Sequence, residues 1–234
     1  MRKYKLNTNY KQILADTITP VSVYLKIRDK FPNSILLESS DYHANDNSFS
    51  YICFNPIASI KVENQKIETN FPDGFSEIIP IDTDVNIAKE IENFSNQFQT
   101  EKSDFKFITQ GLFGYLAYDA IQYFEKVSIA KKSIENEIPE IFYAVYQNII
   151  AINHFKNEAY LFCHSFDGSN NIAEIEQLLQ VKNFASFSFQ KSGNGTSNLT
   201  DDEFKNYVSL AKKHCLRGDV FQLVLSRRFS QDFK

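Results

Sequence analysis

The sequence has no tryptophan, few cysteines and no long apolar run. Its three cysteines, Cys53, Cys163 and Cys215, lie far apart, and no CxxC pair or Cys/His cluster has the spacing of a zinc site. We therefore expect reduced, buried thiols, as is usual in the cytoplasm. No stretch approaches the roughly 18 apolar residues of a membrane span, and the polar residues 1–10 do not resemble a signal peptide. These absences predict a cytoplasmic protein without a membrane partner.

Positive charge is not concentrated anywhere along the chain. The 25 Lys and Arg residues are outnumbered by 29 Asp and Glu residues, which gives a net charge of −4, and the basic pairs are isolated. Binding to nucleic acid requires a basic face that neutralises phosphates. The sequence therefore predicts no nucleic-acid partner.

The common catalytic motifs are missing as well. There is no P-loop, GxGxxG, HExxH or Gly-x-Ser-x-Gly, and the glycines at 111 and 114 do not form a phosphate loop because neither Lys nor Ser/Thr follows them. Each histidine lacks a partner at ligand spacing, so each is interpreted as an ordinary surface or core residue: His43, His154, His164 and His214.

What the sequence does contain is aromatic bulk. It has 22 Phe and 12 Tyr, and 43% of its residues are apolar, so a large core is available. Strand-like and helix-like runs mix without a regular βαβ repeat, which predicts an α+β fold of β-sheets flanked by helices. Asn55-Pro56 is expected to end a strand, and residues 63–65 to connect a hairpin. The expected strands are 34–39, 49–54, 58–62, 66–69, 142–154, 158–164 and 220–229, and the expected helices are 20–30, 86–98, 172–179 and 200–216.

The organisation changes near residue 191. Residues 191–198 (KSGNGTSN) are polar and Gly/Ser-rich, which is typical of a linker. Thr200 and Glu203 then have the spacing of a capping box, and Gly218 is expected to stop the helix that they begin. We predict one domain over residues 1–190, a linker over 191–199, and an incomplete second domain over 200–234.

Three segments have more than a generic pattern. In the first, Leu36-Leu37-Glu38-Ser39 precedes Ser50-Tyr51-Ile52. Glu38 ends an apolar strand, where it is either a buried carboxylate that needs a partner or a solvated strand end. The second, residues 111–125 (GLFGYLAYDAIQYFE), is interpreted as a core element in which Gly111 and Gly114 allow close backbone approach.

The third segment is residues 216–229 (LRGDVFQLVLSRRF). Within its predicted strand, Gln222 must find hydrogen-bond partners or cost about 1–3 kcal/mol. Gln222 is therefore either a candidate site residue or a satisfied structural glutamine.

In this order and spacing, the three segments resemble the chorismate-using enzyme family and, within it, anthranilate synthase component I. The first is similar to the family's LLES element and its YSFIG…P strand, the second to GGxxGYxxYDxxRYFE, and the third to AGDIFQVVLSxRF, which opens the chorismate-binding domain. Residues 149–155 resemble the family's vfDH strand. The departures are Ser48 and Gln122 for a usual Arg, Cys53 for Gly and Asn153 for Asp; those at Ser48 and Cys53 affect the outline of the effector pocket.

The resemblance implies a carbon-oxygen lyase that makes anthranilate from chorismate and ammonia or glutamine in tryptophan biosynthesis. It also implies Mg²⁺, a glutamine amidotransferase partner (component II) and feedback inhibition by tryptophan. In the tryptophan site, Glu38 would face the ammonium, Ser39 would hydrogen-bond to the ligand, and Ser50 would lie on the neighbouring strand. Gln222 would line the chorismate site, where some members carry a Lys base, a role that a neutral Gln cannot serve.

In the family, the magnesium ligands and the catalytic His belong to a part that follows residue 234. We therefore expect no metal site in this chain and no activity from it alone. Two alternatives remain open. Gln at position 222 also occurs in aminodeoxychorismate synthase component I, and a stand-alone amino-acid-binding module would end here naturally.

Overall fold

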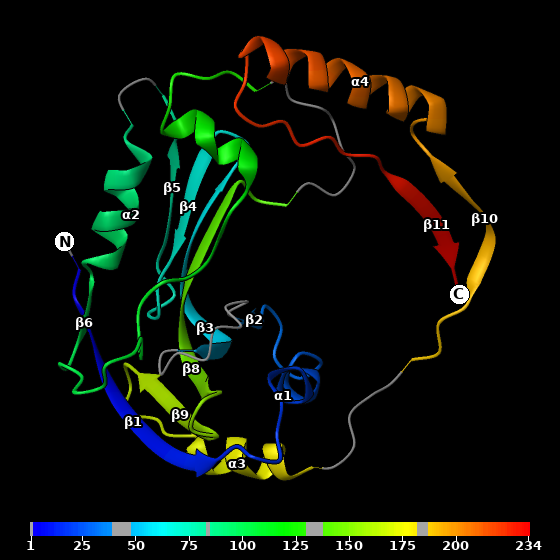
Figure 1. Ribbon diagram of the computed structural model, residues 1–234. Coiled ribbons are helices and arrows are strands. Elements are labelled where there is room, and N and C mark those ends of the chain that lie inside the picture. Colours follow the sequence, from blue (N-terminus) through cyan, green and yellow to red (C-terminus); the bar gives the residue numbers. More distant parts are fainter. Residues whose placement is uncertain (1, 39–47, 83–84, 130–137, 182–186) are drawn as a thin grey trace. The chain divides into compact units, whose positions relative to one another are not determined.

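The computed structural model describes residues 2–38, 48–82, 85–129, 138–181 and 187–234 (Figure 1). The chain divides into two compact units, Met1–Phe184 and Ala185–Lys234, which we describe separately. The division lies before the boundary at residue 190 that the composition suggested. Among the described helices, none combines the length and the apolar character needed to span a bilayer.

The first unit is built on a mixed sheet, which with its flanking helices gives the α+β class that the sequence predicted. The strand order is β5-β4-β3-β8-β9-β1-β6, with β2 added to β3 and β7 added to β8. The β1–β6 pairing is parallel and the other pairings are antiparallel. The strands are β1 (Tyr4–Leu14), β2 (Ile35–Glu38), β3 (Phe49–Glu63), β4 (Lys66–Asn70), β5 (Ser76–Pro80), β6 (Phe98–Thr100), β7 (Phe113–Leu116), β8 (Ile141–Asn153) and β9 (Glu158–Ser165).

Helices cover the sheet in two places (Figure 1). Helices α1 (Pro20–Ile27) and α3 (Ile172–Gln180) bury Val23, Ile27 and Ile175 against Ile52 and other residues of β3, β8 and β9. Helix α2 (Ile87–Ser95) packs with β3, β4 and β8 around a second cluster, and the 3₁₀ helix η1 (Tyr118–Tyr123) contributes its alanine to it. A third cluster is formed by aromatic and small residues of β3, β7, β8 and β9.

The central strand β3 is longer than predicted, because Asn55-Pro56 does not end it. Asn55 has φ 58°, and a bulge lies between Pro56 and Ala58. On one side, β2 pairs with residues 50–53 and β4 with residues 59–63. Pro56 lies between these two partners, where its missing N–H breaks no ladder bond on that side.

The predicted hairpin after β3 is confirmed. Glu63 pairs with Lys66, and the two connecting residues, Asn64 and Gln65, have φ of 52° and 58°. Two residues of positive φ are the requirement of a type I′ turn, whose twist matches that of the flanking strands. Asn86 caps α2 through a hydrogen bond from Lys89 N to its side chain, as helix starts require.

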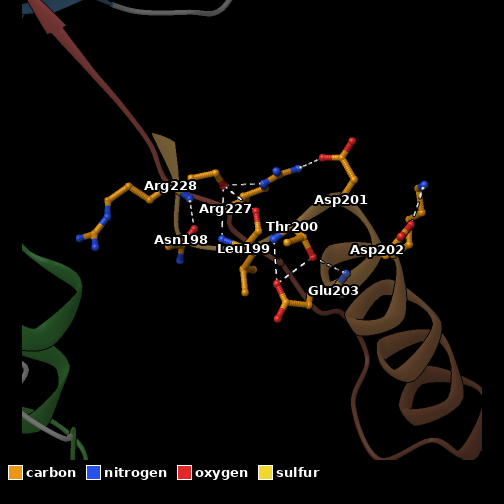
Figure 2. Close-up of polar contacts among 10 residues, drawn as sticks. Asn198, Leu199, Thr200, Asp201, Asp202, Glu203, Arg227 and Arg228 are labelled. Carbon is orange, nitrogen blue, oxygen red and sulfur yellow. Dashed lines mark hydrogen bonds and ion pairs between the residues drawn. The ribbon is translucent and has the colours of Figure 1, made fainter. Parts of the chain in front are cut away.

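The second unit begins with β10 (Lys191–Ser197), followed by α4 (Asp201–Arg217) and β11 (Phe229–Phe233). The predicted capping box is present: Thr200 Oγ1 accepts from Glu203 N, and Glu203 Oε2 accepts from Thr200 N at 2.8 Å (Figure 2). Gly218 ends α4 in the left-handed conformation with φ 77°, also as predicted. Arg227 donates to Asp201 Oδ1 at 2.6 Å, which ties the segment before β11 to the start of α4.

Three expectations about this unit are wrong. Residues 191–197, expected to be linker, form β10, because their backbone pairs with β11 while their polar side chains stay outside. Residues 220–228 form no strand, because no segment of the described chain pairs with them in a ladder, and an alternating pattern without a partner strand does not fix a strand. Cys215 is exposed because α4 buries no residue, whereas Cys53 and Cys163 are buried free thiols.

Candidate functional site

Glu38 and Ser50, which the sequence assigned to one site, meet on one face of the sheet. Glu38 is directly opposite Ser50 in the β2–β3 register, and Ser50 is directly opposite Ile152 in the β3–β8 register. Directly opposite residues of antiparallel strands point to the same face, with Cβ atoms about 4.5–5.5 Å apart. As predicted, Ser50 therefore lies on the strand next to Glu38.

His154 joins these two residues from a third strand. It follows β8, and its backbone N–H donates to Ser48 O at 3.1 Å, which continues the β3–β8 ladder. Its Nε2 lies 2.7 Å from Ser50 Oγ. Glu38 and Ser50 thus come from the adjacent strands β2 and β3, and His154 comes from the end of the next strand, β8; we call these three residues the β2–β3–β8 cluster.

The cluster lies where an apolar layer ends. Two residues away from each member of the cluster, on the same face of the sheet, lie Leu36, Ile52 and Ile152. These three side chains pack in the core beneath α1 and α3. Glu38 and His154 are exposed, whereas Ser50 is 1% exposed. The cluster therefore offers an exposed carboxylate and an exposed imidazole on either side of a buried hydroxyl.

The turn that follows β8 holds His154 in place. Asn153 is buried, and its Oδ1 accepts from Phe155 N at 2.9 Å and from Lys156 N at 3.0 Å. An amide oxygen accepts these bonds as a carboxylate would, which accounts for Asn153 standing where the resembling family has Asp.

Cys53, which also departs from the family pattern, lies on the other face of the sheet. Cys53 is opposite Ile35 and packs in the third core cluster, on the face away from Glu38, and burial raises the pKa of its thiol. Cys53 therefore does not line the β2–β3–β8 cluster. Ser39, the remaining residue assigned to this site, lies outside the described residues.

Gln222 belongs to the second unit. It lies in the segment between α4 and β11 that has no regular structure, its side chain is exposed, and within the described chain it has no hydrogen-bond partner. The described residues of the second unit therefore provide no polar partner for the Gln222 side chain.

The sequence analysis treated His154 and His164 as ordinary residues and did not foresee the contacts that either histidine makes. The contact of His154 with Ser50 joins residues 104 positions apart, so no local spacing announces it. His164 is buried beside a cavity of about 140 Å³ whose wall is otherwise mostly apolar. Among the described residues, no group of three or more His, Cys, Asp or Glu side chains is placed to hold a metal ion.

The comparisons of this chain with known proteins agree on one enzyme family. Residues 33–234 match the model of the chorismate binding enzymes. Anthranilate synthase component 1 of Lactococcus lactis subsp. lactis is 30% identical over 235 aligned positions, which cover 95% of this chain and 49% of that protein. Anthranilate synthase component 1 of Aquifex aeolicus is 26% identical, covering 100% of this chain and 50% of that protein.

The fold has a solved counterpart. The crystal structure of anthranilate synthase component I from Streptococcus pneumoniae TIGR4 superposes with a TM-score of 0.54 at 22% identity, covering 94% of this chain and 49% of that one. At this identity the likeness concerns the fold alone. The chain spans about half the length of these relatives.

Proposed function

Because the chain belongs to the family of chorismate binding enzymes, we propose that it is the N-terminal, regulatory part of an anthranilate synthase component I. Two relatives of that name match nearly the whole of it, and each is about twice its length. In this proposal the full-length enzyme makes anthranilate from chorismate and ammonia, and a glutamine amidotransferase subunit supplies the ammonia. The cytoplasm remains the proposed location, in keeping with the free, buried thiols of Cys53 and Cys163.

The observation that carries the regulatory role is the opposition of Glu38 and Ser50 beside His154. An exposed carboxylate at the end of an apolar layer suits a ligand that has both an ammonium group and a large apolar side chain. Tryptophan is such a ligand, and we propose that its ammonium binds Glu38. Ser39, which follows Glu38, is proposed as a second contact.

The catalytic part of the enzyme is proposed to follow residue 234. We assign the Mg²⁺ ligands to that later part, since the chain spans only about half the length of the relatives named anthranilate synthase component 1. Gln222 is proposed to line the chorismate site once that part is present. As a neutral amide it would accept or donate hydrogen bonds to the substrate and would not act as a base.

Glu38→Gln in the full-length enzyme tests the regulatory role. In this proposal the apolar side chain of the bound ligand shields the ion pair between its ammonium and Glu38 from water. We therefore expect about 30-fold or more weakening of tryptophan inhibition, because removing one member of a desolvated charge pair costs upwards of about 2 kcal/mol. Each inhibition curve is measured with chorismate, ammonium and magnesium and is normalised to the activity of the same variant without tryptophan. The matched control is Glu77→Gln, which removes an exposed carboxylate from β5. Overlaying curves for wild type and Glu38→Gln would make Glu38 a solvated strand end.

The same assay tests the enzyme assignment. We expect anthranilate fluorescence from the full-length enzyme and none above a heat-killed control from residues 1–234. A product identified as aminodeoxychorismate would assign the chain to the sister synthase. Turnover by residues 1–234 would contradict a catalytic part that follows residue 234.

A further inference from the structure

The β2–β3–β8 cluster contains a donor that the proposed tryptophan site does not yet use. We propose that Nδ1–H of His154 binds the carboxylate of the amino-acid effector, and that the Ser50 hydroxyl positions the His154 ring for this contact. This inference rests on the proposed regulatory function. It makes His154 a ligand-binding residue and Ser50 a positioning residue.

Ser50 determines which ring nitrogen of His154 carries the proton. Ser50 is almost fully buried, and its hydroxyl lies 2.7 Å from Nε2. Within the described chain the hydroxyl has no other acceptor, and a buried hydroxyl proton without an acceptor is unfavourable. Ser50 therefore donates to Nε2. A neutral imidazole that accepts at Nε2 carries its proton on Nδ1, so the second nitrogen of this exposed ring is a donor.

The spacing of the strands fits the head group of an α-amino acid. Glu38 lies on β2 and His154 directly follows β8, two strands away and about 9.5 Å across the sheet, with Ser50 on β3 between them. His154 is also two residues along from Ile152, which is level with Ser50 and Glu38, so about 12 Å separates the two backbones. In an amino acid the nitrogen and the carboxyl carbon are about 2.5 Å apart. A carboxylate oxygen lies about 3 Å from that nitrogen, so with a hydrogen bond of about 2.8 Å at each end the head group joins two protein atoms about 8–9 Å apart. The His154 ring reaches across to Ser50 on β3, so its nitrogens lie nearer to Glu38 than the backbone of His154 does. A zwitterion lying obliquely across β3 can therefore meet Glu38 with its ammonium and His154 with its carboxylate.

The polarity of the cluster matches this orientation. Glu38 is anionic and only accepts hydrogen bonds, so it selects the ammonium end. His154 presents a donor on the opposite side of Ser50, and the apolar layer of Leu36, Ile52 and Ile152 adjoins the cluster. A ligand without a carboxylate would keep the Glu38 contact and lose only the His154 contact.

Paired ligands test this in the full-length enzyme. L-tryptophan has both charged groups, and tryptamine lacks the carboxylate. For each variant we would measure the ratio of the tryptamine and L-tryptophan inhibition constants. His154→Ala is expected to lower this ratio by about 10- to 100-fold, through weaker L-tryptophan inhibition and unchanged tryptamine inhibition. Ser50→Ala, which frees the ring, should lower it less, and His154→Gln, which keeps a donor, should restore part of it. The matched control is Lys156→Ala, an exposed residue of the same turn.

The outcomes separate the two proposals. If Glu38→Gln weakens inhibition but His154→Ala and His154→Gln keep the wild-type ratio, His154 does not bind the carboxylate and the regulatory site stands without it. If His154→Ala weakens inhibition by both ligands equally, its role is structural and the inference is overturned. If L-tryptophan does not inhibit the wild-type enzyme, or Glu38→Gln leaves its inhibition unchanged, the regulatory function itself is wrong and this inference with it.

Discussion

At the scale of single residues, His164 shows how burial sets a protonation state. Its Nε2 lies 2.9 Å from Thr109 O, which can only accept, so Nε2 carries the proton. Its Nδ1, 2.9 Å from Thr8 Oγ1, then accepts from that hydroxyl. Burial lowers the pKa of His164, and the hydrogen bond to the Thr109 carbonyl opposes this only in part. The folded chain therefore holds a neutral imidazole.

This predicts a loss of stability in weak acid. The folded-state pKa of His164 lies below the ordinary value of 6.5, so below about pH 6.5 the unfolded chain takes up a proton that the folded chain resists. The free energy of unfolding should fall with pH in this window, by at most about 1.4 kcal/mol per pH unit for one proton. Urea unfolding of residues 1–234 at pH 7.5 to 5.5 measures it. In His164→Gln the slope should be shallower; equal slopes for both proteins would contradict the prediction.

The residues of the proposed effector site were predictable to different degrees. Glu38 and Ser50 follow from their motif, and the β2–β3 register brings them opposite one another. His154 does not follow from its motif, because its partner Ser50 reaches it only through the pairing of β3 with β8. Side-chain contacts made by long-range strand pairing have no local signature in a sequence.

At the scale of elements, local chemistry was the reliable guide. The capping box of α4 and the turn at Asn64-Gln65 depend on neighbouring residues, and both are present as predicted. Strand β1 was missed because its alternation mixes polar and aromatic residues, and its pairing with β9 and β6 joins distant segments. The false strand at 220–229 shows the converse, since a correct alternation had no partner strand to pair with.

Strand β7 can pack against β8 only if residue 114 has no side chain, and one substitution tests this. Gly114 pairs with Tyr143 of β8, and a Cβ at Gly114 would overlap Phe142 O and lie 2.8 Å from Tyr143 Cα. Gly114→Ala should therefore push β7 off β8 and lower the free energy of unfolding by about 3 kcal/mol or more. Gly168→Ala is the matched control: Gly168 has φ 79° and open space around it, so only backbone strain of about 1 kcal/mol is expected. Equal losses in thermal or urea unfolding would show that β7 yields without cost.

At the scale of the whole molecule, the two units differ in how they are stabilised. The first unit has three clusters of buried apolar side chains. In the described part of the second unit no residue is buried, and apolar residues of α4 such as Tyr207, Leu210 and Leu216 are exposed. Its order depends on local devices: the capping box, the β10–β11 pairing and the Arg227–Asp201 ion pair. Exposed ion pairs and caps contribute about 1 kcal/mol each or less, which is little against the entropy of ordering a helix.

The last prediction follows from this difference and concerns amide hydrogen exchange. Helix α4 has 17 residues, only slightly more than the length below which even Ala-rich helices are marginal in water, and it contains a single alanine. Without tertiary packing it should therefore be only marginally stable. In residues 1–234 its amides should therefore exchange at least about 100-fold faster than those of β3 and β8, which open only with the core. In the full-length enzyme, where the proposed second domain continues, packing on the apolar side of α4 should slow the same amides. The measurement is exchange followed by mass spectrometry on both proteins under one condition, with β3 and β8 as the internal reference. Equally slow exchange of α4 and β8 in residues 1–234 would mean that the second unit is stable by itself, and the proposal that it opens a larger domain would lose its physical support.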